Sequence, residues 1–265
     1  MKAKALVLHA PGTNRDYDAQ KALTLAGANA EIVHISELKE GTKKMTDYQL
    51  LVLPGGFSYA DALGAGKFLA YNLVKYFFDD LNEFVQAGKP VIGVCNGFQV
   101  LVKAGILPGN VSGSGISKNS YEAPNATLTF NQDRKFECRS VYLKAQSTTC
   151  IWTKNLHEII HCPIAHGEGR FFADDTVMKE IHAHDQIALV YTHANGKPAN
   201  GEYPLNPNGS CDDIAGICNK SGTVLGLMPH PENNVIPRMH TNEKAQAETK
   251  AALALWKAGV DYVSS

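Results

Sequence analysis

Pro90-Val91-Ile92-Gly93-Val94-Cys95-Asn96-Gly97-Phe98-Gln99 is the stretch on which the fold of this chain depends. Its apolar run from Val91 to Val94 is short and predicts a buried strand. The residues from Asn96 to Ala104 carry apolar side chains at helical spacing and predict a helix. Cys95 therefore stands at the junction of a strand and a helix.

The cysteine is flanked by glycines two positions before and two positions after it, Gly93 and Gly97. This is the cysteine version of the G-x-S-x-G nucleophile elbow, in which the turn is too tight for side chains and the nucleophile has a strained backbone. The helix that begins there directs its N–H groups and positive dipole end at the sulfur, which favours the thiolate. A lone G-x-C-x-G also fits a buried structural cysteine, so the remaining motifs have to decide.

Strands and helices alternate around this stretch. Helices are predicted over 17–26, 66–87 and 96–104, with a short one inside 36–47. Strands are predicted over 4–9, 30–35, 49–53 and 91–94. This βαβ rhythm with short apolar strands predicts an α/β fold: an open, mainly parallel sheet with helices on both faces.

The second half of the chain has a different pattern. Alternating apolar and polar residues over 126–131, 136–145 and 158–165 predict mixed or antiparallel strands. A short helix is expected over 174–182, and further strands over 186–191, 213–219 and 224–228. The final helix is expected over 241–258, with Gly259 as its C-cap. We expect one domain over 1–265, with loop excursions near 107–125 and 195–212. Within the second excursion, residues 195–210 are expected to form an exposed loop.

The composition excludes several classes of protein. The 265 residues carry a formal net charge of −1, which argues against a nucleic-acid-binding face. No apolar run approaches the roughly 18 residues of a membrane span. The six cysteines are scattered without C-x-x-C pairs or metal-ligand spacing, and the histidines show no ligand spacing either. We therefore expect reduced thiols, a cytoplasmic location and no metal site.

Three further segments carry chemistry, and the first is Leu53-Pro54-Gly55-Gly56-Phe57-Ser58-Tyr59-Ala60-Asp61. Its two glycines follow a predicted parallel strand, where open α/β sheets bind ligands. Their backbone N–H groups, with that of Asn96, could stabilise the oxyanion formed when a thiolate attacks a carbonyl. A plain Pro-Gly-Gly turn is the alternative interpretation of the segment.

The second segment is Met228-Pro229-His230-Pro231-Glu232, directly after a predicted strand. The prolines make it rigid and extended, which places His230 and Glu232 on the same side. The carboxylate can then orient the imidazole, and the imidazole can exchange a proton with the thiol and with a leaving amine.

The third segment is Ala165-His166-Gly167-Glu168-Gly169-Arg170-Phe171, also after an apolar strand. Its glycines and polar side chains suit a loop that contacts a zwitterionic ligand. His166 is a second candidate base, with a glutamate two residues on. We rank His230 above it because Gly167 makes the link between His166 and Glu168 flexible.

Taken together, these four motifs resemble those of the class I, triad-type glutamine amidotransferases, over nearly the whole chain. Within that family the chain is similar to the glutaminase subunits of phosphoribosylformylglycinamidine synthases. The resemblance implies a flavodoxin-like fold, Cys95 as nucleophile, His230 as acid–base and Glu232 as its orienting partner. It further implies an oxyanion and glutamine-binding set of Gly55, Gly56, Phe57, Asn96, Gln99, His166, Gly167, Glu168, Gly169 and Phe171.

The resemblance also implies the reaction and its partners. Glutamine would be hydrolysed through a cysteinyl thioester, and ammonia would pass to a large synthetase subunit, with a small third subunit completing the enzyme. This chain would hold no cofactor; ATP and magnesium would belong to the synthetase, since no P-loop motif is present. Departures from the family pattern are Ala60 in place of glycine, Gly64 in place of a common arginine, and a longer stretch over 110–129.

Three alternatives remain open from sequence. The chain could be a cysteine hydrolase or chaperone-like relative, an inactive subunit that only binds a partner, or a glutaminase for another acceptor such as GMP or CTP synthesis. The intact Cys95, His230 and Glu232 argue against the first two. The choice of acceptor depends on the resemblance alone.

Overall fold

The computed structural model describes residues 2–109, 126–237 and 243–264. Its α-helices are α1 (Asp16–Leu25), α2 (Ile35–Lys39), α3 (Lys67–Gln86), α4 (Asn96–Lys103), α6 (Asp175–Ala183) and α7 (Glu243–Tyr262). Its strands are β1 (Lys4–His9), β2 (Asn29–His34), β3 (Leu50–Leu53), β4 (Val91–Val94), β5 (Ala126–Thr129), β6 (Glu137–Ala145), β7 (Ile160–His166), β8 (Arg170–Ala173), β9 (Ile187–Thr192), β10 (Ile214–Cys218) and β11 (Val224–Leu227).

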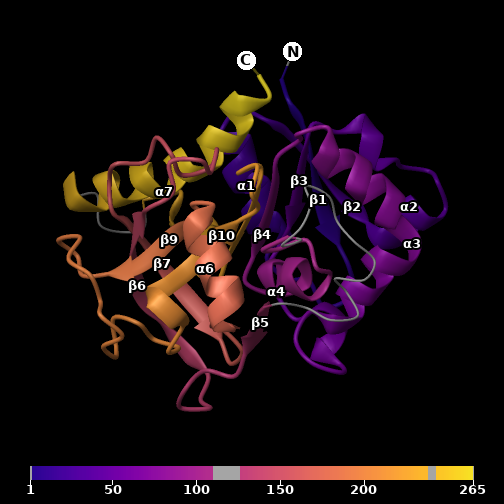
Figure 1. Cartoon of the computed structure of the whole chain (residues 1–265). Helices are drawn as coiled ribbons and strands as arrows, with labels where there is room; N and C mark the ends of the chain where they lie inside the picture. The colour runs from indigo at the N-terminus through magenta and orange to yellow at the C-terminus, as the bar shows by residue number, and fades with distance from the viewer. Residues whose placement is uncertain (1, 110–125, 238–242, 265) are drawn as a thin grey trace.

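One large sheet runs through the molecule in the order β2-β1-β3-β4-β11-β10-β9-β6-β7 (Figure 1). Neighbouring strands from β2 to β11 are parallel, and the pairs from β11 onward to β7 are antiparallel. The predicted α/β fold is confirmed, and so is the change to antiparallel pairing in the second half of the chain. The last strands, β6 and β7, alternate buried and partly exposed positions, whereas β3 and β4 are buried at every position.

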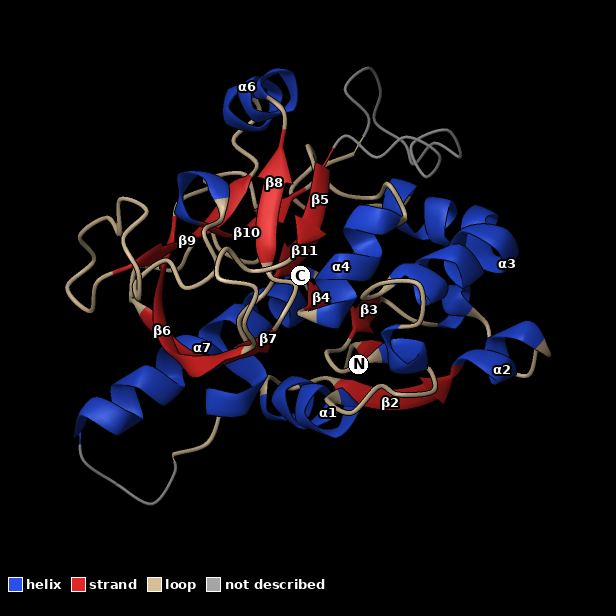
Figure 2. Ribbon diagram, turned by 90° about the horizontal axis from the view of Figure 1, so that it is seen from below, coloured by secondary structure: helices blue, strands red, loops and turns tan. Residues whose placement is uncertain are grey.

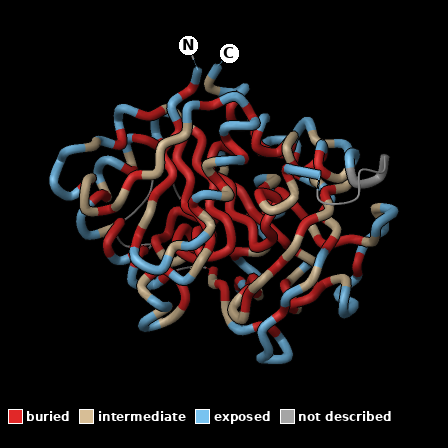
Figure 3. Tube along the Cα trace, turned by 180° about the vertical axis from the view of Figure 1, so that it is seen from behind, coloured by how far each residue is buried: buried red, intermediate tan, exposed pale blue. Residues whose placement is uncertain are grey.

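Helices cover both faces of the sheet, as predicted. Figure 2 shows α1 and α7 on one side of the strands and α3 and α4 on the other. Strands β3, β4, β10 and β11 are buried at every position, which explains why they are short unbroken apolar runs. In Figure 3 this buried centre is surrounded by exposed loops.

The carboxyl ends of three adjacent strands meet at the middle of one sheet edge. β4 lies between β3 and β11 and is parallel to both. The Gly55-Gly56 loop follows β3, Cys95 follows β4, and the segment with His230 follows β11. The three motifs that are far apart in the sequence are therefore brought together by strand order.

The far end of the sheet curves back toward the same place. Strand β7 is the last strand, yet the backbone N–H of His230 donates to the carbonyl of Pro163 in β7 over 2.8 Å. The thiol of Cys95 lies 3.8 Å from the carbonyl oxygen of Ala165, also in β7. The 165–171 segment thus joins the other three motifs, although its strand is not their neighbour in the sheet.

Several expectations require correction. Helix α7 continues to Tyr262, so Gly259 lies inside the helix and is not a C-cap. Glycine is required there because a Cβ would come within 2.2 Å of the Trp152 ring. Residues 170–173 form strand β8, paired with β5 in a small antiparallel sheet, where a loop was expected. The 195–210 loop is not exposed throughout, because Asn206, Asn208 and Ser210 are buried.

The predicted excursion over 110–129 is only partly visible, because residues 110–125 lie outside the described residues and 126–129 form β5. Within the described ranges, none of the helices has the length and apolar character needed to cross a membrane.

Candidate active site

Cys95 has the strained backbone that the elbow pattern predicts. Its φ is 51° and its ψ is −106°, in a region that residues with a side chain rarely occupy. A Cβ on Gly97 would lie 1.9 Å from the carbonyl oxygen of Leu53, and one on Gly93 would lie 2.6 Å from that of Gly97. Glycine is therefore required at both positions for β3, β4 and α4 to pack around the cysteine.

His230 and Glu232 form a buried pair. The Nδ1 atom of His230 lies 2.6 Å from Oε1 of Glu232, and both side chains are buried. The two side chains lie together as predicted, but the predicted extended segment is wrong: Pro231 begins a short 3-10 helix (Pro231–Asn234), which turns the carboxylate back toward the imidazole. The other carboxylate oxygen, Oε2, has no hydrogen-bond partner among the described residues.

The surroundings of His230 favour its protonated form. Burial lowers the pKa of the imidazole, but the charge of Glu232 and the neighbouring thiol of Cys95 outweigh it and raise the pKa to about 10. An imidazolium at this position is able to donate a proton to a leaving group.

The Gly55-Gly56 loop lies directly against these residues. A Cβ on Gly55 would come within 2.7 Å of the His230 ring and 3.4 Å of Cys95 Cβ. The N–H of Phe57 donates to the carbonyl of Gly12, so it is not available to a substrate. The N–H of Gly56 has no acceptor among the described residues, and that of Asn96 is in the first turn of α4, where helical N–H groups have no intrahelical partner. These two N–H groups are the candidate oxyanion donors.

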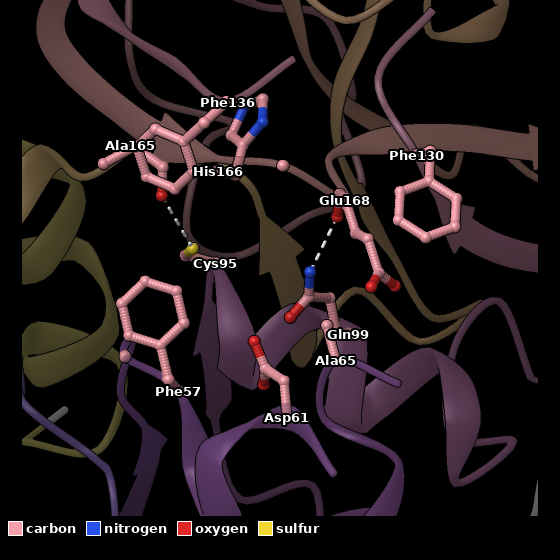
Figure 4. Close-up of a pocket in the computed structure, with 12 residues that line it drawn as sticks. Phe57, Asp61, Ala65, Cys95, Gln99, Phe130, Phe136, Ala165, His166 and Glu168 are labelled. Carbon is pink, nitrogen blue, oxygen red and sulfur yellow. Dashed lines mark hydrogen bonds between the residues drawn. The ribbon is translucent and has the colours of Figure 1, made fainter. Parts of the chain in front are cut away.

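A cavity of about 180 Å³ opens beside the sulfur (Figure 4). Its wall contains both candidate glutamine-binding loops as well as the elbow. The lining residues are Gly56, Phe57, Asp61, Ala65, Cys95, Gln99, Phe130, Phe136, Ala165, His166, Gly167 and Glu168.

A chain of amide hydrogen bonds crosses one side of this cavity. The Nε2 group of Gln99 donates to the carbonyl of Glu168 over 2.6 Å, and its Oε1 accepts from Asn96 Nδ2 over 3.0 Å. The Oδ1 atom of Asn96 accepts from the N–H of Ser58. The Gln99 side chain therefore joins the elbow helix α4 to the 165–171 segment, and this holds the cavity wall together.

His166 has a very different environment from His230. Its Nδ1 atom lies 3.0 Å from Oδ1 of Asn131, which also accepts from the N–H of Gly169, while Asn131 Nδ2 donates to the carbonyls of Lys135 and His166. Because Oδ1 of Asn131 is the acceptor, the imidazole carries its proton on Nδ1. Burial, with the charge of His230, lowers the pKa of His166 to about 4.

The structure brings most of the predicted residues to one place. Gly55, Asn96 and His230 each adjoin a residue that lines the cavity, Glu232 contacts His230, and Gly169 packs on the His166 ring. Phe171 is the exception: its side chain is completely buried and stacks on Phe98, so it supports the wall without lining it.

Sequence reasoning missed two polar residues of the site, Asn131 and Asp61, as well as the lining residues Ala65, Phe130, Phe136 and Ala165. Asn131 is buried and all of its amide atoms are engaged, yet it lies more than 30 positions from His166. Its only sequence signal is a polar residue directly after a short strand. Asp61 stands at the end of the quoted Gly-Gly motif and lines the cavity, but it was not singled out.

Comparisons with known proteins show which family the chain resembles along its whole length. A family model described as a CobB/CobQ-like glutamine amidotransferase domain matches residues 2–263. A protein of Treponema denticola named phosphoribosylformylglycinamidine synthase subunit PurQ is 59% identical over 99% of this chain and 100% of its own length. One of the same name from Methanococcus maripaludis is 44% identical over 88% of this chain and 82% of its own. A solved structure described as PurLQS from Thermotoga maritima matches with a TM-score of 0.72 and 31% identity over 99% of each chain.

Proposed function

The chain belongs to the family of CobB/CobQ-like glutamine amidotransferase domains, and we propose that it is the glutaminase subunit of a phosphoribosylformylglycinamidine synthase. The observation that carries the proposal is the placement of Cys95, His230 and Glu232 at the ends of adjacent parallel strands, beside a cavity, in a chain so similar to proteins of that name. It supports the roles expected for the three residues.

In the first half of the reaction, the Cys95 thiolate attacks the side-chain carbonyl carbon of glutamine, and a C–S bond forms. The negative charge moves to the carbonyl oxygen, where the N–H groups of Gly56 and Asn96 stabilise it. As the tetrahedral intermediate collapses, the C–N bond breaks, and the His230 imidazolium gives its proton to the leaving nitrogen, which departs as ammonia.

In the second half, water attacks the γ-glutamyl thioester and His230 takes a proton from it. The C–S bond breaks, glutamate leaves, and the thiolate of Cys95 is restored beside the reprotonated imidazole. Throughout the cycle, Glu232 keeps the Nδ1 side of the imidazole in place and stabilises its positive charge, as the third member of a triad does.

Ammonia passes to a larger synthetase subunit, which makes formylglycinamidine ribonucleotide from formylglycinamide ribonucleotide and ATP in purine biosynthesis. A small third subunit completes the assembly, as the three-letter PurLQS description of the Thermotoga maritima structure suggests for that protein. ATP and magnesium bind to the synthetase, and no cofactor binds to this chain. We place the enzyme in the cytoplasm, in keeping with its free cysteines.

Ammonia release from glutamine tests the proposal. The wild-type chain is assayed alone and with the synthetase subunits, ATP and formylglycinamide ribonucleotide. We expect low activity alone, strong stimulation by the complete mixture, and loss of activity in Cys95→Ala. Cys138→Ala is the matched control, because this cysteine is exposed and free, and we expect it to keep wild-type activity.

Two outcomes would contradict the proposal in different ways. No turnover under any condition would favour a subunit that only binds its partner. Turnover that depends on Cys95 but does not change with the synthetase would support the glutaminase chemistry and contradict the proposed ammonia acceptor. The acceptors of CTP and GMP synthesis would then be tested.

A further inference from the structure

Asp61 lies on a strained turn beside the catalytic cavity. Tyr59, Ala60 and Asp61 have φ values of 54°, 55° and 52°, and Leu63 has a φ of 68°. The left-handed conformation is unfavourable for every residue that has a side chain. Such strain is typically kept where it positions a functional group.

The turn directs the Asp61 carboxylate into the cavity. Figure 4 shows it on the side of the cavity opposite His166, pointing toward the space between Cys95 and Gln99. Its Oδ1 atom accepts a hydrogen bond of 3.1 Å from Asn96 Nδ2, so the carboxylate is connected to the residue that follows the nucleophile. This contact fixes Asp61 relative to the reacting sulfur.

The charges around the cavity favour a cationic ligand group at this position. Among its lining residues the formal charges at neutral pH come from two carboxylates, Asp61 and Glu168, and none is a lysine or arginine. Burial raises the pKa of Asp61, as does Glu168, while hydrogen bonds from Gly66 and Asn96 and the charge of Lys103 act in the opposite direction. A bound cation would offset the cost of keeping this half-buried carboxylate charged.

The two carboxylates differ in their partners. Glu168 Oε2 lies 3.8 Å from the ammonium of Lys103, whose own hydrogen bond goes to the carbonyl of Ala65. Asp61 has no ion pair in the described part of the chain; its hydrogen-bond partners are the side-chain amide of Asn96 and the backbone of Gly66. Asp61 is therefore the carboxylate with capacity for a new cation.

We propose that Asp61 binds the α-ammonium group of the substrate and makes the site specific for an α-amino acid whose carboxamide lies at Cys95. The inference rests on the proposed glutaminase function and adds a specificity-determining residue to it. Gln99 then acts mainly as a structural link, because both ends of its amide are engaged within the protein.

A comparison of two substrates tests the inference. Glutaramate is glutamine without its α-ammonium group, and ammonia release from both compounds is measured with the chain assembled with its synthetase subunits. For the wild type we expect kcat/KM to be on the order of 100-fold higher for glutamine, which is the effect of one lost hydrogen bond to a charged group. In Asp61→Asn, which keeps the acceptor for Asn96, we expect the rate with glutamine to fall about 100-fold and the rate with glutaramate to change little.

Glu168→Gln is the matched control, because it removes the other carboxylate of the cavity. We expect it to lower both rates by a similar factor and to keep the preference for glutamine. A preference that persists in Asp61→Asn, or that disappears only in Glu168→Gln, would overturn the inference. Should Asp61→Asn not fold, equal kcat/KM for the two substrates in the wild type would overturn it as well.

Failure of the proposed function would look different. The wild type would then release ammonia from neither compound, with or without its partners. Activity with glutamine in the wild type, combined with no effect of Asp61→Asn on the preference, would leave the glutaminase in place and reject Asp61 alone.

Discussion

The chain contains two His-x-Glu motifs, 166–168 and 230–232, and each follows a strand that ends at the active site. In the second motif the carboxylate lies 2.6 Å from the imidazole, and the pKa of His230 is raised to about 10. In the first, the histidine contacts an asparagine instead, and its pKa is lowered to about 4. The same spacing thus gives one imidazolium and one neutral imidazole.

The difference comes from the residue between the two side chains and from what surrounds them. Pro231 starts a short helical turn that brings Glu232 back to its histidine. Gly167 leaves Glu168 free to turn toward Lys103, 3.8 Å away. The neutral amide of Asn131 then takes the place of the carboxylate at His166. The local backbone after each histidine, and not the spacing of the two residues, decides which imidazole has a carboxylate beside it.

The largest expected effect is the difference in lost activity between replacing the carboxylate of the second motif and replacing that of the first. Glu232→Gln removes the charge that stabilises the His230 imidazolium, and we expect glutaminase kcat to fall by about 10²- to 10⁴-fold, as in other triads. It also moves the alkaline loss of activity to a pH about 1–3 units lower. For Glu168→Gln we expect a loss of less than about tenfold. Steady-state ammonia release between pH 6 and 10 measures both, and equal losses would contradict the assignment.

The two histidines also have opposite effects on stability. His230 has a raised pKa, so its contribution to the free energy of unfolding is complete below the ordinary value of about 6.5 and is lost as the pH rises toward 10. His166 has a lowered pKa, so its contribution is complete above about 6.5 and is lost as the pH falls toward 4.

Histidine-to-asparagine variants separate these contributions. The wild type should lose about 3 kcal/mol of its free energy of unfolding through His166 between pH 6.5 and 4, and His166→Asn should not show this loss. His230→Asn should likewise lack a loss of similar size between pH 6.5 and the alkaline range. Urea unfolding at pH 4.5, 6.5 and 9 provides the measurement. If the two variants had the same pH dependence, the two sites would not differ as described.

The smallest effect concerns two glycines, Gly167 inside the first motif and Gly169 directly after it. A Cβ at Gly169 would lie 2.4 Å from His166 Nδ1, so Gly169→Ala should displace the ring and cost about 1–3 kcal/mol. At Gly167 the nearest atom would be 3.8 Å away and the backbone is not left-handed, so Gly167→Ala should change stability by less than about 0.5 kcal/mol. Thermal unfolding of the two variants compares them, and equal losses would show that His166 is not held by Gly169.

The parts of the site that follow a local rule were predictable from sequence. The elbow glycines, the Gly55-Gly56 loop and the His230–Glu232 pair each lie within one short segment at a strand end, and parallel pairing brings the segments together.

The parts that were missed depend on contacts between distant segments. Asn131 meets His166 across 35 positions, and Asn208 and Ser210 bind the backbone of Gly169 and Phe171 across 39. No periodicity marks a buried polar residue that finds its partner only in the folded chain. The C-cap prediction for Gly259 was wrong for the same reason. A glycine is required at this position by the distant Trp152 ring and not by the end of the helix.

The most direct test of the account is the protonation state of the two histidines, measured by ¹⁵N–¹H NMR of the imidazole nitrogens in the full chain, with His166→Asn and His230→Asn used for assignment. The account predicts that at pH 7.5 His230 carries protons on both nitrogens, while His166 is neutral and carries its proton on Nδ1. A neutral His230, or a His166 that is protonated on both nitrogens at this pH, would contradict it.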